Sequence, residues 1–264
     1  MNQRLALLLG IAAGGAYVYT DRKNRRSTER IAAAALETLL NAVDANDEGT
    51  GKHVRRVAAC ALIIAEAAGL EERQKRAIER VALFHDIGKI HEALFDIVHD
   101  HTKLTAEQRR EIATHPRRGA EVLAPLAAFY PELPKGVLAH HERWDGKGYP
   151  RGLRGNRIPL EARITAIADT FDAVTHNRRY RQGSGVQIAV EVIGAGRGTQ
   201  FDPELVDLAL FPPIVAQMQN VRIATGARRR TPGTRPHERA PDVSFRWRSE
   251  SLGSRRVESP ARVD

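Results

Sequence analysis

Four histidines lie on the apolar stripes of segments whose periodicity predicts helices: His53, His85, His115 and His141. A single histidine on such a stripe is usually a core residue that one hydrogen bond satisfies. Four in one domain are harder to explain in this way, because burying several imidazoles without partners is costly. A divalent cation gives each imidazole a partner, and neutral imidazole is the commonest metal ligand in proteins. The histidines therefore predict a metal centre.

Carboxylates complete the predicted ligands. Asp86 directly follows His85, and a helix predicted for residues 161–175 places Asp169 and Asp172 on one face. The helical period does not decide which of these two aspartates is a ligand, and the other is expected to be only a neighbour on that face. Histidine and aspartate ligands without cysteine suit iron, manganese or other borderline-to-hard divalent ions. Because the ligands exceed what one ion needs, two metal ions are expected.

The segments that carry these residues are predicted to be helices. Apolar residues recur at intervals of three and four, and no convincing alternating strand is present. The predicted helices span residues 29–45, 51–68, 71–86, 105–116 and 161–175. Thr105 and Gln108 form a capping box at the start of the fourth helix, and Pro116 is expected to end it. The sequence therefore predicts an all-α domain, without internal repeats or a glycine-rich phosphate loop.

Composition limits the classes of protein to consider. The chain has 264 residues, of which 42% are hydrophobic and 28% charged, as expected for one globular domain with appendages. Its single cysteine, Cys60, excludes an internal disulfide and a thiolate metal cluster. The net charge of +9 comes from residues 1–30, with six basic and two acidic side chains, and from residues 218–264, with eleven arginines and five acidic side chains. The middle is nearly neutral, so specific nucleic-acid binding is not expected.

The two ends are predicted to lie outside the folded domain. Residues 5–19 are all apolar or glycine, and basic residues follow them. We expect residues 1–26 to form a single-pass anchor in the cytoplasmic membrane, with the downstream chain in the cytoplasm. The alternatives are a buried helix and a cleaved signal peptide, and the missing A-x-A site argues against the second. Residues 27–217 are predicted to form the domain, and residues 218–264 a basic, disordered tail.

Several motifs give the chain a family resemblance. Residues 85–89 read HDIGK, and residues 140–160 read HHERWDGKGYPRGLRGNRIPL. Together with ADTFDA at 168–173 and GTQFDP at 198–203, this ordered set resembles the HD-GYP branch of the HD phosphohydrolase superfamily, over roughly residues 35–215. The resemblance implies an HD-domain helical bundle that is extended by C-terminal helices and by the loop around Gly148, Tyr149 and Pro150, here called the GYP loop.

The function that this resemblance implies is hydrolysis of a cyclic dinucleotide, typically cyclic di-GMP, to linear pGpG or GMP with two metal ions, often iron. The implied metal ligands are His53, His85 and Asp169 for one ion, His115, His140 and His141 for the other, and Asp86 between the two. The other implied residues are Asp47, as a carboxylate that assists the attacking water, Lys89, Arg178 and Arg181, as phosphate contacts, and Tyr149, as a substrate-side aromatic. Asp47, Asp86 and Lys89 would be the catalytic residues, at the inner face of a bacterial membrane.

The sequence departs from the family pattern at two places. Gly49 stands where members with three metals carry a glutamate, so a third ion is not expected. Residues 90–104 lack the usual Pro-Gly loop and carry His91, His99 and His101. Because of this altered loop, one alternative is an HD phosphohydrolase that acts on another nucleotide. The other alternative is a catalytically weak adaptor that binds a partner such as a diguanylate cyclase through residues 148–150, although the intact ligands argue against it.

We expect the full-length protein to sediment with membranes and to resist extraction by roughly 1 M salt, at which the Debye length is about 3 Å. An inserted apolar helix is not released by salt, whereas the attraction of basic side chains to anionic lipid is screened. The domain should be protected from protease in intact cells and digested in inverted vesicles. Release of the intact chain by salt would show peripheral attachment instead.

Overall fold

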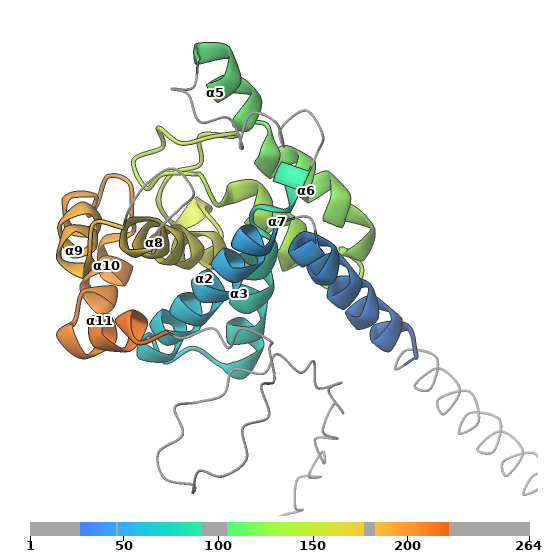
Figure 1. Cartoon of the computed structure of the whole chain (residues 1–264), viewed down its shortest axis with the longest axis horizontal. Helices are drawn as coiled ribbons and strands as arrows, with labels where there is room; N and C mark the ends of the chain where they lie inside the picture. Colours follow the sequence, from blue (N-terminus) through green and yellow to red (C-terminus); the bar gives the residue numbers. More distant parts are fainter. Residues whose placement is uncertain (1–26, 46, 91–104, 177–182, 222–264) are drawn as a thin grey trace, which may run out of the picture. The chain divides into compact units, whose positions relative to one another are not determined.

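The computed structural model describes residues 27–45, 47–90, 105–176 and 183–221 (Figure 1). The chain divides into two compact units, Met1–Leu36 with Val243–Asp264, and Glu37–Asp242. In the first unit, the described residues are a helical segment, 27–36. The second unit contains the other described helices and every described residue of the predicted site.

The second unit is built from helices. Residues 37–45 are helical. They are followed by α2 (Glu48–Ala67), α3 (Glu72–Phe84), η1 (Ile87–Ile90), α5 (Ala106–Ile112), α6 (His115–Leu123), η2 (Ala124–Leu126), α7 (Glu132–Ala139), η3 (Gly155–Arg157), α8 (Leu160–Thr175), α9 (Val186–Ala195), α10 (Pro203–Ala209) and α11 (Pro212–Gln219). Among the described residues there is no strand, only an isolated bridge between Arg197 and Phe201. The predicted all-α fold is confirmed for this part of the chain.

Helix α8 lies at the centre of the core of this unit. Helices α2, α3, α7 and α9 all pack against it, as Figure 1 shows for α2. Ile164, Ile167 and Phe171 of α8 are completely buried, and burial of each such side chain stabilises the fold by about 1.5–3 kcal/mol. Because α2, α3 and α7 carry or directly precede predicted ligands, burying the apolar face of α8 also gathers those ligands.

Helix α2 begins earlier than the apolar pattern indicates. Its N-cap is Asp47, whose carboxylate accepts hydrogen bonds from the backbone N–H groups of Gly49 and Thr50. The helix therefore starts at Glu48, ahead of the predicted residue 51. It ends as predicted before Gly69, whose φ of +65° suits the residue that follows a helix.

The helix predicted for residues 105–116 is wrong, because the structure has two helices there. The first, α5, starts at the predicted capping box of Thr105 and ends at Ile112. The second, α6, begins at His115 with Pro116 in its first turn. At that position the N–H that proline lacks would have no partner within the helix anyway. Pro116 therefore starts a helix and does not end one.

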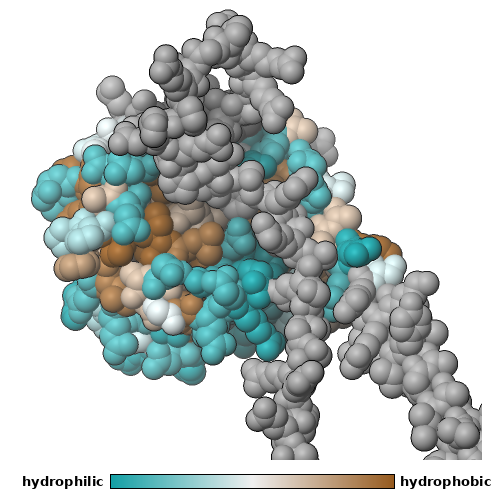
Figure 2. Space-filling view, turned by 90° about the horizontal axis from the view of Figure 1, so that it is seen from below, coloured by the Kyte–Doolittle hydropathy of each residue, from teal (hydrophilic) through white to brown (hydrophobic). Residues whose placement is uncertain are grey.

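At the C-terminal side, α11 continues to Gln219, and Met218 is completely buried. The folded chain therefore extends beyond residue 217. Helices α10 and α11 pack against α2, and Ala67, Leu208, Phe211 and Ile214 line a hollow where they meet. Figure 2 shows apolar side chains gathered on one face of the molecule. None of the predicted site residues that the structure describes lines this hollow.

Several predictions fall on residues that the structure does not describe. They are the anchor at residues 1–26, the loop histidines His91, His99 and His101, the phosphate contacts Arg178 and Arg181, and the tail from residue 222 onward. Among the described residues, no helix is both long enough and apolar enough to cross a membrane. The anchor stays a prediction.

Gly88 allows η1 to lie directly against α6. A Cβ atom at this position would lie 2.1 Å from the backbone oxygen of His115 and 2.7 Å from the backbone nitrogen of Gly119. Because both are backbone atoms, the two elements would have to move apart. We expect Gly88→Ala to lower the free energy of unfolding by about 1–3 kcal/mol in urea titrations.

The matched control is Gly194→Ala in α9, where the new methyl group would meet only Leu210 Cδ1, at 3.6 Å. This variant should be neutral or slightly stabilising, because alanine favours the helix over glycine. Equal unfolding free energies for the two variants would contradict the proposed tight contact.

Candidate metal centre

Asp86 lies between two sets of imidazoles. It follows the end of α3 and is 7% exposed. Its Oδ2 atom is 3.4 Å from His85 Nε2 and 4.0 Å from His53 Nε2. Its Oδ1 atom is 3.3 Å from His115 Nε2 and 3.9 Å from His140 Nε2. The two oxygens of one carboxylate therefore face different histidines.

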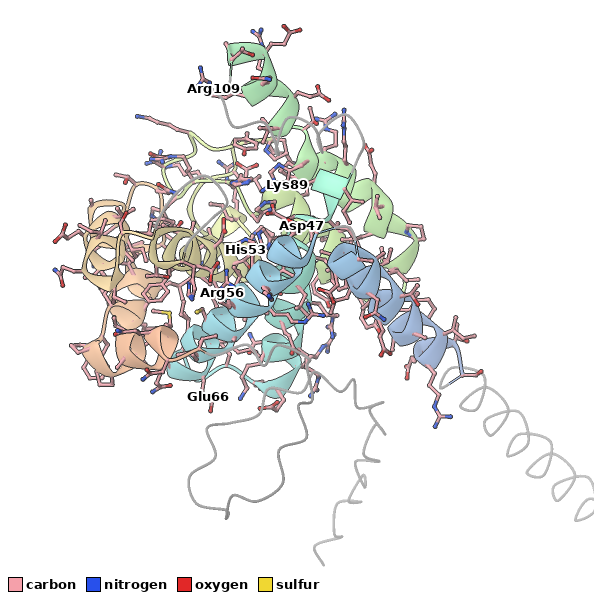
Figure 3. The ribbon with its side chains drawn as sticks, in the orientation of Figure 1. Asp47, His53, Arg56, Glu66, Lys89 and Arg109 are labelled. Atoms are coloured by element: carbon pink, nitrogen blue, oxygen red, sulfur yellow. The ribbon has the colours of Figure 1, made fainter. Side chains whose placement is uncertain are left out.

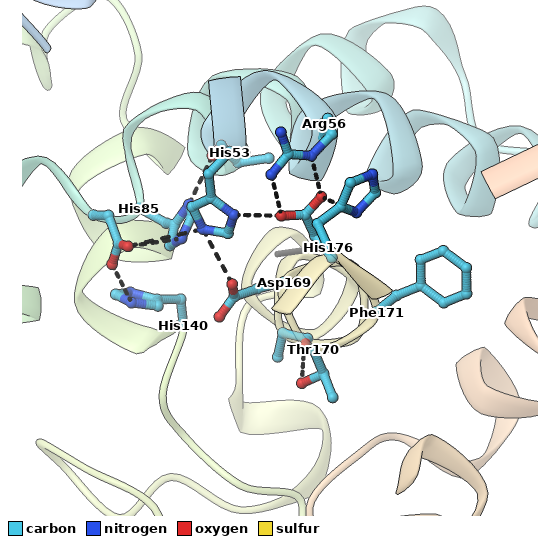
Figure 4. Close-up of polar contacts among 12 residues, drawn as sticks. His53, Arg56, His85, His140, Asp169, Thr170, Phe171 and His176 are labelled. Carbon is cyan, nitrogen blue, oxygen red and sulfur yellow. Dashed lines mark hydrogen bonds and ion pairs between the residues drawn. The ribbon is translucent and has the colours of Figure 1, made fainter. Parts of the chain in front are cut away.

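The predicted ligands form two groups around this carboxylate. His53, His85 and Asp169 make up the first group, and His115, His140 and His141 the second. Within each group the candidate ligand atoms all lie within 4.8 Å of one another. In Figure 4, the side chains of His53, His85 and Asp169 converge, with His140 beside them. The structure thus brings together all seven predicted ligands, which come from α2, α6, α8 and the chain that follows α3 and α7.

Backbone carbonyls orient three of the imidazoles. The Nδ1 atoms of His85, His115 and His140 lie 2.8, 2.7 and 2.6 Å from the carbonyl oxygens of Ala82, Ile112 and Val137. Each of these carbonyls belongs to the last turn of a helix, where it has no partner within the helix. A carbonyl only accepts, so each Nδ1 must donate its hydrogen. The lone pair of each Nε2 then points into the site, as a metal ligand requires.

Several buried polar atoms of the site have no hydrogen-bond partner among the described residues. Within the described part of the chain, His53 Nε2, His85 Nε2 and Asp86 Oδ1 are buried without a hydrogen-bond partner. The Nε2 atoms of His115 and His140 are only 3.1 Å apart, and both carry lone pairs. Buried polar atoms without partners are costly, and facing lone pairs repel. A cation in each group removes both costs, so this set of oxygen and nitrogen donors fits two divalent ions.

Charges in the site suit cations. Burial lowers the pKa of His140 well below its ordinary value and lowers that of His141 to about 3, so both rings are neutral at pH 7 and free to bind metal. Burial raises the pKa of Asp86, but Lys89 and His85 outweigh it and hold that pKa well below its ordinary value. Asp86 is therefore ionised, as a ligand shared by two cations should be.

Asp172 is more than a neighbour on the helix face, so that expectation is wrong. It is 1% exposed, and its Oδ2 atom accepts a hydrogen bond from His53 Nδ1 at 2.7 Å. Arg56 donates to both of its oxygens, from Nε at 2.5 Å and from Nη2 at 2.9 Å (Figure 4). Burial lowers the pKa of His53, but the nearby carboxylates of Asp169 and Asp172 raise it to about 9.

The GYP loop packs against His141 of the second group of ligands. The ring of Tyr149 stacks on His141, with centroids 5.0 Å apart and an interplanar angle of 22°. A Cβ atom on Gly148 would lie 2.6 Å from the backbone oxygen of His141, so only glycine allows this approach. Tyr149 is 36% exposed, so part of its side chain beside His141 is open to solvent.

Glu142 is a site residue that the sequence did not predict. It is buried, and its two carboxylate oxygens accept hydrogen bonds from the backbone nitrogens of Arg151 and Leu153, at 2.7 and 2.9 Å. Glu142 thereby holds the loop beside the histidine pair that precedes it. The signal available in the sequence was a glutamate directly adjoining two predicted ligands.

The predicted catalytic residues Asp47 and Lys89 also have defined contacts. Lys89 Nζ donates to Asp86 Oδ2 at 2.7 Å. Asp47 caps α2 and also accepts a hydrogen bond from Thr50 Oγ1 at 2.7 Å. Figure 3 shows Asp47, His53 and Arg56 following one another along α2. Asp47 therefore has a structural role that the sequence did not predict.

The chain is similar to known proteins over its central part. Residues 37–205 match the family described as HD domain. The chain is 40% identical over 177 residues to the cyclic di-GMP phosphodiesterase response regulator RpfG of Xanthomonas campestris pv. campestris. The aligned region is 66% of this chain and 46% of that protein. It is 39% identical over 174 residues to the 3'3'-cGAMP-specific phosphodiesterase 2 of Vibrio cholerae. This aligned region is 65% of this chain and 33% of that protein.

A solved structure shares the fold. The HD domain of the L. monocytogenes phosphodiesterase PgpH, in complex with cyclic-di-AMP, matches with a TM-score of 0.52 and 20% identity, over 71% of this chain and 100% of that one. The chain spans less than half the length of the two curated relatives above.

We expect the full chain to bind about two divalent ions, because the ligand atoms form two groups. His115→Ala, which removes a ligand of the second group only, should bind about one. Elemental analysis of anaerobically purified protein measures both ratios. Equal ratios for the two proteins, or a ratio near zero for the wild type, would contradict the two-group arrangement.

Proposed function

This chain belongs to the HD domain family, and on that premise we propose that it is a two-metal phosphodiesterase that hydrolyses a cyclic dinucleotide. The match confirms the predicted family, and the motifs at residues 85–89 and 148–150 are those of its HD-GYP branch. The observation that carries the proposal is the position of Asp86, with one oxygen toward each group of ligand atoms. A carboxylate in this position can hold two cations a short distance apart, as two-metal hydrolases of phosphate esters do.

Cyclic di-GMP is the proposed substrate, and linear pGpG or GMP the proposed product. The support is the similarity to RpfG, whose name states that activity. A second candidate substrate is 3'3'-cyclic GMP-AMP, because a comparably similar relative is named for it. We disfavour a catalytically weak adaptor, because all seven predicted ligands lie together.

The side chains around the ligands have separate tasks in this proposal. Bound divalent cations would make the attacking water more acidic and offset the charge that develops on the phosphoryl oxygens. Lys89, with Nζ next to Asp86, would donate to a phosphate oxygen, and Asp47 would accept a proton from the attacking water. Tyr149, held by His141, would border the substrate. Arg178 and Arg181 would contact the phosphates.

The nature of the ions and the location of the protein belong to the same proposal. Iron or manganese suits a site with histidine and carboxylate donors and no thiolate. The predicted anchor at residues 1–26 would keep the hydrolase near the cytoplasmic face of a membrane, and residues 148–150 could serve a protein partner such as a diguanylate cyclase.

We expect Asp86→Asn to lower kcat/KM by roughly 10³-fold or more, since losing a shared ligand costs several kcal/mol of transition-state stabilisation. The control is Asp207→Asn, which removes an exposed aspartate that pairs with Arg197 and should retain nearly full activity. Initial rates with cyclic di-GMP and with 3'3'-cyclic GMP-AMP give both the effect and the substrate preference. Hydrolysis of neither compound by the metal-loaded wild type would refute the proposed function.

A further inference from the structure

Asp172 is a buried carboxylate that belongs to neither group of ligands. Its Oδ2 atom contacts His53 Nδ1 and Arg56 Nη2, at 2.7 and 2.9 Å. Its Oδ1 atom contacts Arg56 Nε at 2.5 Å and His176 Nδ1 at 3.1 Å. Both oxygens are thus engaged by these three side chains, and the bidentate guanidinium fixes their orientation. Asp172 is therefore built to act on its partners and not to bind a metal directly.

Of the three partners of Asp172, His53 is the predicted metal ligand. Its contact with a carboxylate distinguishes His53 from the three histidines that backbone carbonyls orient. His85, His115 and His140 donate from Nδ1 to neutral backbone carbonyls. His53 donates to an ionised carboxylate, which withdraws the hydrogen more strongly and makes the opposite nitrogen a better donor to a metal. Nε2 of His53, on the far side of the ring, is 3.3 Å from Asp169 Oδ1 in the first group.

The two groups also differ in charge. The first group contains Asp169 and two histidines, whereas the second contains three histidines, and Asp86 offers one oxygen to each. Among the described residues, only the first group has a further carboxylate behind one of its histidines, and Arg56 pairs with that carboxylate. Since negative charge near a buried cation is strongly favourable, the first group should hold a divalent ion more tightly.

We propose that Asp172 is a positioning residue that acts through His53 to make the His53–His85–Asp169 group the tighter of the two cation sites. This group then fills before the His115–His140–His141 group as the metal concentration rises. The inference rests on the proposed two-metal centre and adds an order of loading and a residue that sets it.

A titration of metal-free full chain with Mn²⁺, followed by calorimetry, tests this order. The wild type should show a tight and a weaker binding step. In Asp172→Asn, which keeps the shape but removes the charge, the tight step should weaken by about 10- to 100-fold, as is typical for loss of an outer partner of a metal ligand. The weaker step should stay unchanged.

The matched control is Asp202→Asn in the N-cap of α10. Asp202 is also a buried aspartate in an arginine pair, with Arg163 Nη1 at 2.5 Å, but it does not contact a ligand. Asp202→Asn should retain both Mn²⁺ steps. Thermal unfolding of the two metal-free variants shows how much each lost ion pair costs the fold, so that a weaker site is not mistaken for a weaker fold.

Two further variants assign the steps. In His115→Ala, the remaining step should be the tight one, and adding Asp172→Asn to it should weaken that step by the same factor. Arg56→Lys keeps the positive charge but loses the bidentate contact, so it should weaken the tight step by less than Asp172→Asn does. This variant provides the test if Asp172→Asn does not fold.

The possible results separate the inference from the proposed function. Unchanged Mn²⁺ affinities in Asp172→Asn and Arg56→Lys, or equal weakening of both steps, would overturn the role of Asp172 while leaving two metals in place. Loss of the same step from Asp202→Asn would also overturn it. A wild type that binds no Mn²⁺ would refute the metal centre, and the proposed function with it.

Discussion

The arrangement of the site depends on one buried carboxylate that must remain ionised. Asp86 lies among four imidazole nitrogens at 3.3 to 4.0 Å, and Lys89 is its only partner of fixed positive charge among the described residues. A buried charge is tolerated only if its surroundings compensate for it. The helices that meet at Asp86 therefore have to hold the imidazoles in fixed orientations. In the proposed centre, the Nε2 atoms and the carboxylate oxygens would then bind the same cations.

The fold meets this requirement with helix ends. Three of the histidines follow a helical turn whose backbone carbonyls have no partner within the helix. Those carbonyls accept hydrogen bonds from Nδ1 and so fix the rings. Gly88 lets η1 lie against the start of α6, which brings His115 to the carboxylate of Asp86. The apolar face of α8 holds α2, α3 and α7 together around the same point. Core packing and ligand geometry are thus properties of the same contacts.

The sequence predicted the helical class and the ligands for different reasons. Periodicity was enough for the all-α fold, and the ordered motifs identified residues that lie far apart in the chain, such as His53 and Asp169. Periodicity could not identify Asp172, because a helical face does not reveal its partner, and Arg56 and His53 come from another helix. Pro116 was misread because proline is acceptable in a first helical turn but not in later ones.

The two sides of the site are supported by different parts of the molecule. On one side, the buried Asp172 of α8 connects His53 to Arg56 of α2. On the other, His141 stacks on Tyr149, and Glu142 ties the same loop to the backbone of Arg151 and Leu153. A shift of the GYP loop would therefore disturb His141 first, whereas His115 and His140 are held by the backbone carbonyls of Ile112 and Val137. In the proposed two-metal centre, the loop that carries Tyr149 thus supports one ligand of the second group, whereas the first group is supported by the packing of α2 against α8.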